Sequence, residues 1–229
     1  MLVRARAILA AVEIARIDIA RVAHGYVGHL NIAFVGSAMF SVVPGLITAF
    51  RAERPDVDLQ LTEMLAAEIV EGLRAGSVDV AFSRPLINSP DEFEERVLVH
   101  EPFVVAVPES HRFSTKDYVE LGDLRGEVLI LYPRHPLPSV TDMVVTACAK
   151  IGFEPTTIIE TRHMQTAVSL VASGMGVTLI AESVGRQQRD NVRFVGLQGD
   201  LKADLSIAWR KETPDAALSA FLKMILHTK

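Results

Sequence analysis

Residues 30–61 read LNIAFVGSAMFSVVPGLITAFRAERPDVDLQL, an apolar strand followed by a turn, a helix and a second strand. The run Leu30–Val35 predicts a buried strand that ends at the small residues of the turn. The apolar residues of the helix recur every three to four positions, at Phe40, Val43, Leu46, Ile47 and Phe50. In the second strand apolar residues alternate with polar ones, at Val57, Leu59 and Leu61. Such a strand–helix–strand unit is the building block of an α/β fold.

The turn between the first strand and the helix suits a bound anion. Free backbone N–H groups and the helix dipole favour negative charge at such a position. Gly36, Ser37 and Ala38 are small, so a ligand can approach this backbone closely. Because no catalytic residue type stands beside them, we interpret the turn as part of a binding site rather than a reaction centre.

A helix–Gly–strand pattern occurs twice, once in each half of the chain. Its copies read LRAGSVDVAFS and LVASGMGVTLIA, with helices predicted at 67–75 and 167–173 that stop at Gly76 and Gly174. Strands are predicted to follow at 78–83 and 177–181. Together with further helix–strand alternation, the repeat favours two similar lobes with a largely parallel sheet. A late strand at 205–209 and a final helix at 216–227 can return to the first lobe.

The N-terminal segment has a pattern of its own. Apolar residues alternate in three- and four-residue steps, forming a short coiled-coil seam of Ala5, Ile8, Val12, Ala15, Ile19 and Val22. The pattern is equally typical of a surface helix that packs on its own domain. We expect the helix to end near His24 and Gly25. Charged residues interrupt it too often for a secretory signal.

Composition limits the classes of function. The net charge is -5, with 23 basic and 28 acidic residues, so the chain as a whole does not attract nucleic acid. Its single cysteine, Cys148, is expected to be a buried inert thiol, which suits a reducing cytoplasm. No apolar run reaches the roughly 18 residues that a membrane span requires, so we expect no membrane partner.

The motifs of common enzymes are missing. Gly174-Met175-Gly176 follows a helix and precedes a strand, the reverse of a dinucleotide-binding turn. The seven histidines show no helical i,i+4 spacing, which makes a metal site improbable. There is no Gly-x-Ser-x-Gly motif around Ser37. We therefore expect no enzyme, no catalytic residues, no metal and no cofactor.

Small polar residues recur instead at predicted helix starts. Besides Gly36-Ser37, these are Ser139-Val140-Thr141 and His163-Met164-Gln165-Thr166. Each start can offer backbone N–H groups and a side-chain donor to a carboxylate, although N-capping alone explains any single case. Arg84 ends the strand 78–83, at the edge where open α/β sheets bind ligands. Arg84 is therefore expected either to contact a ligand or to form a surface or interlobe salt bridge.

The ordered motifs resemble the LysR-type transcriptional regulators. The residues that carry the resemblance are GYVGHLNIAFVGSAMFSVVPGLITAFRAERPDVDLQLTE, EGLRAGSVDVAFSR and LVASGMGVTLIAES. The segments AFSRP, LILYPRHPLPS and FEPTTIIETRHMQTAVSLVASG are similar to the subgroup that regulates aromatic degradation in response to benzoate, muconate or chlorinated catechol products.

The resemblance implies an α/β fold of two Rossmann-like lobes, as in type 2 periplasmic binding proteins, preceded by the end of a linker helix. Residues 1–24 would be this coiled-coil helix, residues 25–103 with 208–229 the first lobe, and residues 104–207 the second lobe. The family's N-terminal winged helix-turn-helix has no counterpart in these 229 residues, so we expect a regulatory fragment.

The resemblance also implies an effector site between the lobes. By position it comprises Gly36, Ser37, Ala38, Met64, Leu65, Ala66, Ser139, Val140, Thr141, Met164 and Gln165. Arg84 matches an arginine that the subgroup associates with an additional effector site. Where this chain has Met64 or Val140, subgroup members often carry a polar or aromatic residue, which puts the identity of the ligand in doubt.

The expected function is thus effector sensing in the cytoplasm, with a small carboxylate, aromatic or muconate-like, controlling a catabolic operon. The expected partners are this effector and further copies of the chain in a homodimer or homotetramer. Operator DNA and RNA polymerase would be contacted only through the full-length protein. An alternative is a periplasmic-type solute-binding protein for a small anion, which would need a secretion signal.

Overall fold

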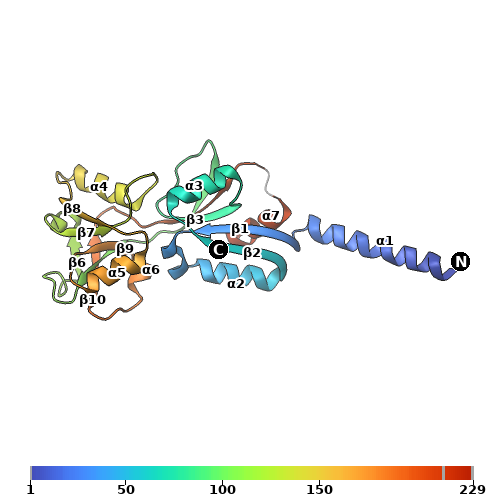
Figure 1. The fold of residues 1–229 in the computed structure, drawn as a ribbon, viewed down its shortest axis with the longest axis horizontal. Coiled ribbons are helices and arrows are strands. Elements are labelled where there is room, and N and C mark those ends of the chain that lie inside the picture. Colours follow the sequence, from blue (N-terminus) through green and yellow to red (C-terminus); the bar gives the residue numbers. More distant parts are fainter. Residues whose placement is uncertain (1, 213–214, 228–229) are drawn as a thin grey trace.

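The computed structural model describes residues 2–212 and 215–227, with only part of the side chains in the first helix. Two α/β lobes lie side by side, and helix α1 (Leu2–Ala23) projects away from them as a separate rod (Figure 1). The chain crosses from the first lobe to the second after β4 and returns before β11. The expected two-lobed α/β fold is therefore confirmed.

The sheet of the first lobe has the strand order β2-β1-β3-β11-β4. Its strands are β1 (Val27–Phe34), β2 (Asp56–Glu63), β3 (Val80–Ser83), β4 (Phe93–Val99) and β11 (Leu205–Arg210). Helices α2 (Val43–Glu53), α3 (Ala66–Ala75) and α7 (Ala216–His227) pack against it. The apolar face of α2 supplies Phe50, whose ring meets Phe221 of α7 edge-to-face at a centroid distance of 4.9 Å.

The register of this sheet brings the carboxyl ends of β1, β2 and β3 to the same edge. β1 and β2 run parallel from the pair Val27 and Asp56 to the pair Phe34 and Glu63. β3 is parallel to β1 on its other side. The carboxyl ends of three neighbouring strands therefore meet at one edge of the sheet, which is the edge that faces the second lobe.

The second lobe contains a sheet with the order β6-β10-β5-β9 and a smaller β7-β8 pair. Its strands are β5 (Phe103–Pro108), β6 (Tyr118–Glu120), β7 (Val128–Leu131), β8 (Thr157–Glu160), β9 (Thr178–Ala181) and β10 (Val192–Gln198). Its helices are η2 (Leu121–Leu124), α4 (Val140–Lys150), α5 (Met164–Ala172) and α6 (Glu182–Gly185). Cys148 is buried in the core of this lobe, and burial raises the pKa of its thiol to about 11.

The expectation of a largely parallel sheet is wrong in part. β11 is antiparallel to both β3 and β4, and β5 is antiparallel to β9 and β10. The reason is that β5 and β11 are the first strands after the two crossovers, so each enters its sheet from the hinge side, against the direction of the strands that it pairs with.

The two crossovers, residues 100–102 and 200–204, lie against each other. The Ala203 N–H donates to the Glu101 carbonyl at 2.8 Å, and Pro102 and Lys202 form an isolated β-bridge. Backbone hydrogen bonds thus join the two connections into one hinge.

Helix α1 ends as expected, at a left-handed glycine. Gly25 has φ 67°, and a Cβ there would lie 2.3 Å from the Ala216 carbonyl oxygen, so a side chain would clash with the backbone at the start of α7. Val12, Ile19 and Val22 of the expected seam are exposed, and the side chains of Ala5 and Ile8 lie outside those described. No helix within residues 2–212 and 215–227 has the length and hydropathy to cross a membrane.

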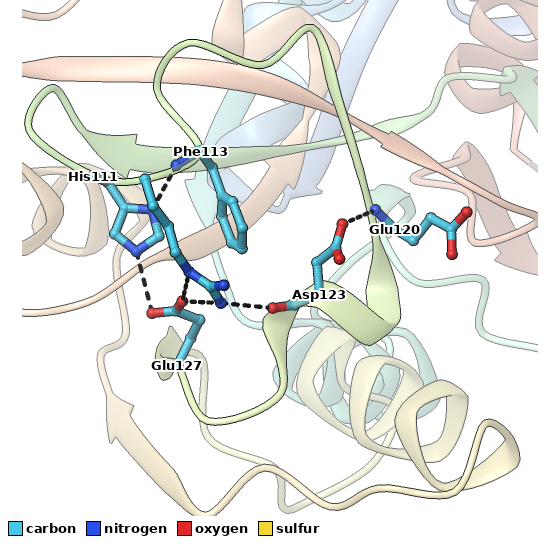
Figure 2. Close-up of polar contacts among 6 residues, drawn as sticks. His111, Phe113, Glu120, Asp123 and Glu127 are labelled. Carbon is cyan, nitrogen blue, oxygen red and sulfur yellow. Dashed lines mark hydrogen bonds and ion pairs between the residues drawn. The ribbon is translucent and has the colours of Figure 1, made fainter.

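The polar segment between β5 and β7, which includes β6 and η2, is held by the partly buried carboxylate of Glu127. Figure 2 shows the Glu127 side chain between the His111 ring and a neighbouring guanidinium, that of Arg112. The Asp123 carboxylate accepts the Glu120 N–H at 3.0 Å and caps η2. This network lies within the second lobe and fixes a segment whose sequence has little apolar periodicity.

Candidate functional site

A cavity of about 240 Å³ lies between the lobes. The first lobe lines it with the starts of η1 (Gly36–Phe40) and α3, and the second lobe with the starts of α4 and α5. The backbone N–H groups at such starts have no partner within their own helices, so each contributes partial positive charge. The cavity is therefore built mainly from helix N-termini, a geometry that suits an anionic ligand.

Most residues of the expected effector site line this cavity. They are Gly36, Ser37, Met64, Leu65, Ala66, Ser139, Val140 and Met164. The structure does not bring three others to it. Ala38 is fully buried in the core of the first lobe, Thr141 is fully buried with its hydroxyl donating to the Tyr132 carbonyl at 2.6 Å, and Gln165 is exposed outside the lining.

The rest of the wall is largely apolar and stiff. The loop between β7 and α4 contributes the rings of Pro133, Pro136 and Pro138 to the lining, and the first lobe contributes Val35 and Leu65. Apolar walls around a few polar groups are typical of sites for small organic ligands.

Glu63, at the end of β2, occupies the space beside Gly36. A Cβ on Gly36 would lie 2.5 Å from the Glu63 carboxylate oxygen Oε1. The missing side chain at Gly36 therefore makes room for this carboxylate, in addition to exposing the backbone. From the sequence, the small residues of this turn are expected only to let a ligand approach the backbone.

Two polar contacts cross the exposed rim of the cavity, which we define as Glu63, Glu68, Arg162 and His163. Arg162 of the second lobe pairs with Glu68 of α3, and His163 Nδ1 lies 3.7 Å from Glu63 Oε1. The Glu68 carboxylate also accepts the Leu65 N–H at 2.8 Å. This backbone hydrogen bond and, after it, the Arg162 guanidinium lower the pKa of Glu68 below its ordinary value.

Arg84 links the inner end of the cavity to the crossovers. Its side chain is 4% exposed and pairs with Glu101, and its Nη1 donates to the Ala203 carbonyl at 2.6 Å. The second Glu101 oxygen accepts the Ser183 N–H at 2.9 Å. Burial lowers the pKa of Arg84, an effect that Glu101 opposes, and a guanidinium remains protonated in proteins. Arg84 both forms the salt bridge and lines the cavity, so neither sequence interpretation excludes the other.

The hydroxyls of Tyr132 and Ser139 differ in their availability for a hydrogen bond to a ligand. Burial, together with the negative Glu63, raises the pKa of Tyr132 to about 12, so its phenol stays protonated and can donate. The Ser139 hydroxyl donates to the Pro133 carbonyl at 2.7 Å and accepts the Thr141 N–H at 3.2 Å. Ser139 is therefore an N-cap whose side chain is already committed.

Sequence reasoning missed the rim acids. The rule that singled out Arg84, a charged residue at the carboxyl end of a strand in an open α/β sheet, applies equally to Glu63. Arg162 and Glu68 carried no such signal, because their pairing joins positions 94 apart in the chain. Within the described residues no group of three or more His, Cys, Asp or Glu side chains could hold a metal ion.

The fold and cavity define a two-lobed ligand-binding domain. Residues 23–229 match the family described as the LysR substrate binding domain, and the chain belongs to that family. The resemblance inferred from the sequence motifs is thereby confirmed. Two of the relatives, CatR and BenM, are named as HTH-type transcriptional regulators.

The chain is similar to the transcriptional regulator CatR of Pseudomonas putida, with 36% identity over 177 residues that cover 77% of this chain and 60% of CatR. Its structure is similar to the BenM effector binding domain solved with its effector benzoate, with 32% identity, a TM-score of 0.74, and 87% and 90% of the two chains covered. It is also similar to full-length CbnR complexed with its target DNA, with 28% identity, a TM-score of 0.80, and 97% and 76% covered. The chain thus spans less than two thirds of CatR.

Proposed function

We propose that this chain is the sensing domain of a LysR-type regulator that binds a small carboxylate, aromatic or muconate-like, between its lobes. The observation that carries the proposal is the cavity itself, where helix N-termini from both lobes surround an apolar space of about 240 Å³. The BenM domain, similar in sequence and structure, was solved with benzoate. That likeness supports an aromatic acid as the ligand class.

The proposed effector residues are those of the expected set that line the cavity, with Arg84 beside them. Backbone N–H groups at Ser37, Val140 and Met164 would hold the ligand's polar groups, and the proline loop would cover its apolar body. A ligand that contacts both lobes binds one arrangement of the lobes better than others, and this difference in affinity is what shifts the regulator's state.

The rest of the proposal concerns the whole regulator. Exposed Val12, Ile19 and Val22 on α1 suit a coiled-coil contact with a second copy, in a homodimer or homotetramer. We propose that residues 1–24, which include α1, continue a linker to a DNA-binding domain in the full-length protein, which contacts operator DNA and RNA polymerase in the cytoplasm. The two lobes would be residues 25–103 with 208–229, and residues 104–207.

Calorimetric titration with benzoate and cis,cis-muconate tests the ligand class. We expect saturable one-site binding of at least one of these acids or of a ring-hydroxylated benzoate, and failure of all of them to bind would refute the class. The site is tested by Ser37→Trp, which fills the cavity and should remove binding. Gln165→Trp is the matched control, because Gln165 lies outside the lining and should leave the affinity within about threefold of the parent, a small difference in free energy.

A further inference from the structure

The charges around the cavity are divided between the lobes. The acids that line it, Glu63 and Glu68, both belong to the first lobe, whereas the guanidinium of Arg162 belongs to the second. The remaining base, Arg84, is buried against Glu101. The two walls therefore present opposite charge to a ligand that lies between them.

The Glu68 carboxylate already accepts hydrogen bonds, whereas within the described residues the Glu63 carboxylate accepts none. Glu68 accepts hydrogen bonds from both the Leu65 N–H and Arg162. Within the described residues the Glu63 carboxylate makes no hydrogen bond, and its contact with His163 at 3.7 Å is beyond hydrogen-bond distance. Its side chain is 45% exposed and lines the cavity. A carboxylate with free acceptor sites thus faces the ligand space.

Glu63 also lies where the first-lobe wall would otherwise receive an anion. Its Oε1 is beside Gly36, at the start of η1. A ligand carboxylate brought to this wall would meet a like charge, which disfavours the ionised form of both groups. A ligand hydroxyl brought there would instead donate to an ionised acceptor, one of the stronger hydrogen bonds in proteins.

We infer that the effector is a hydroxyl-bearing aromatic acid, and that Glu63 selects it by accepting the hydroxyl hydrogen bond. This inference rests on the proposed function, because it assigns the chemistry of the same site. The carboxylate of the ligand lies toward the second lobe, near the start of α4 and away from the contact between Glu63 and His163. Its ring lies between the proline loop and the apolar residues of the first lobe. A simple dicarboxylate fits less well, since one of its ends faces Glu63.

The test is calorimetric titration of the chain with benzoate, 3-hydroxybenzoate, 4-hydroxybenzoate and cis,cis-muconate. With the parent protein, at least one hydroxybenzoate should bind about tenfold more tightly than benzoate, in line with a hydrogen bond to a charged acceptor. In Glu63→Ala this advantage should fall to about twofold or less. In Glu63→Gln muconate should bind about tenfold more tightly than it binds the parent, because the repulsion is removed.

Glu68→Gln is the matched control. It makes the same acid-to-amide change on the same rim, at a carboxylate that is already paired, so it should leave the hydroxybenzoate advantage intact. Thermal unfolding of each variant verifies that it is folded. Benzoate binding as tightly as both hydroxybenzoates, or an advantage that survives Glu63→Ala, overturns this inference while the proposed function stands. Failure of all four acids to bind overturns both.

Discussion

Arg84 and Glu101 join the inner end of the cleft to the crossovers with side chains that are 4% and 7% exposed, whereas Arg162 and Glu68 cross the rim with side chains that are 59% and 47% exposed. Both pairs are an arginine with a glutamate. The inner pair is enclosed by further hydrogen bonds to Ala203 and Ser183. The rim pair is exposed to solvent, so its members can separate at little cost.

The two ion pairs restrain the lobes to different degrees. Breaking a buried pair leaves an uncompensated charge in the interior, and breaking an exposed one leaves two hydrated charges. The lobes are therefore held together at the crossovers and are only lightly restrained at the rim. This is the arrangement that a ligand needs if its binding is to shift the lobes.

The largest expected effect comes from breaking the inner pair. Glu101→Ala should lower the free energy of unfolding by about 3–5 kcal/mol, because Arg84 remains buried without its partner. Glu68→Ala removes the corresponding acid at the rim and should cost no more than about 1 kcal/mol. Chemical denaturation of both variants measures the difference. Equal losses would show that burial does not distinguish the two ends of the cleft.

A double variant tests whether the loss of stability comes from the unpaired charge. Replacing both partners with apolar residues, Arg84→Met with Glu101→Leu, removes the buried charges together. The double variant should regain about 2 kcal/mol relative to Glu101→Ala. Recovery is incomplete because the Ser183 N–H and the Ala203 carbonyl lose their partners. A double variant no more stable than Glu101→Ala would contradict the assignment of the loss to an unpaired charge.

Ser139 and Ser37 extend the comparison to hydroxyls within the cavity. Ser139→Ala should cost about 1 kcal/mol of stability, because it removes an N-cap with two hydrogen bonds inside the second lobe. It should change the affinity for an aromatic acid by about threefold at most, equivalent to well under 1 kcal/mol. Ser37 makes no side-chain hydrogen bond within the described residues, so Ser37→Ala should alter affinity more than stability. Denaturation and calorimetry on the same samples distinguish the two patterns.

The smallest expected effect is the pH dependence of the rim. The pKa of Glu68 lies below the ordinary value of 4.5. A lowered pKa in the folded state means that Glu68 stabilises the protein above pH 4.5, and that this contribution disappears as the pH falls through the folded-state pKa. Because the pair is exposed, the contribution should stay below about 1 kcal/mol. An NMR titration should show the pKa of Glu68 rising in Arg162→Ala. An unchanged pKa would mean that Arg162 does not hold this carboxylate.

Local patterns were sufficient for much of the fold. The strand–turn–helix–strand of residues 30–61 appears as β1, η1, α2 and β2, with the helix beginning a few residues later because the turn forms a short 3₁₀ segment. Helix α5 and strand β9 also follow their expected pattern. β6 and β8, by contrast, are short strands, with only their central residues turned toward the core of the second lobe. Their sequences lack the alternation that marks a half-buried strand.

The chain's periodicity and its glycine stops specify two α/β lobes, and the placement of small polar residues at helix starts specifies which loops form the cleft. Those features are local, since they depend on residues a few positions apart. Which acid of one lobe meets which base of the other depends on the packing of the lobes, as Glu68 with Arg162 and Glu63 with His163 show. No local pattern encodes those contacts, because they join residues about one hundred positions apart that come together only when both lobes have folded and docked.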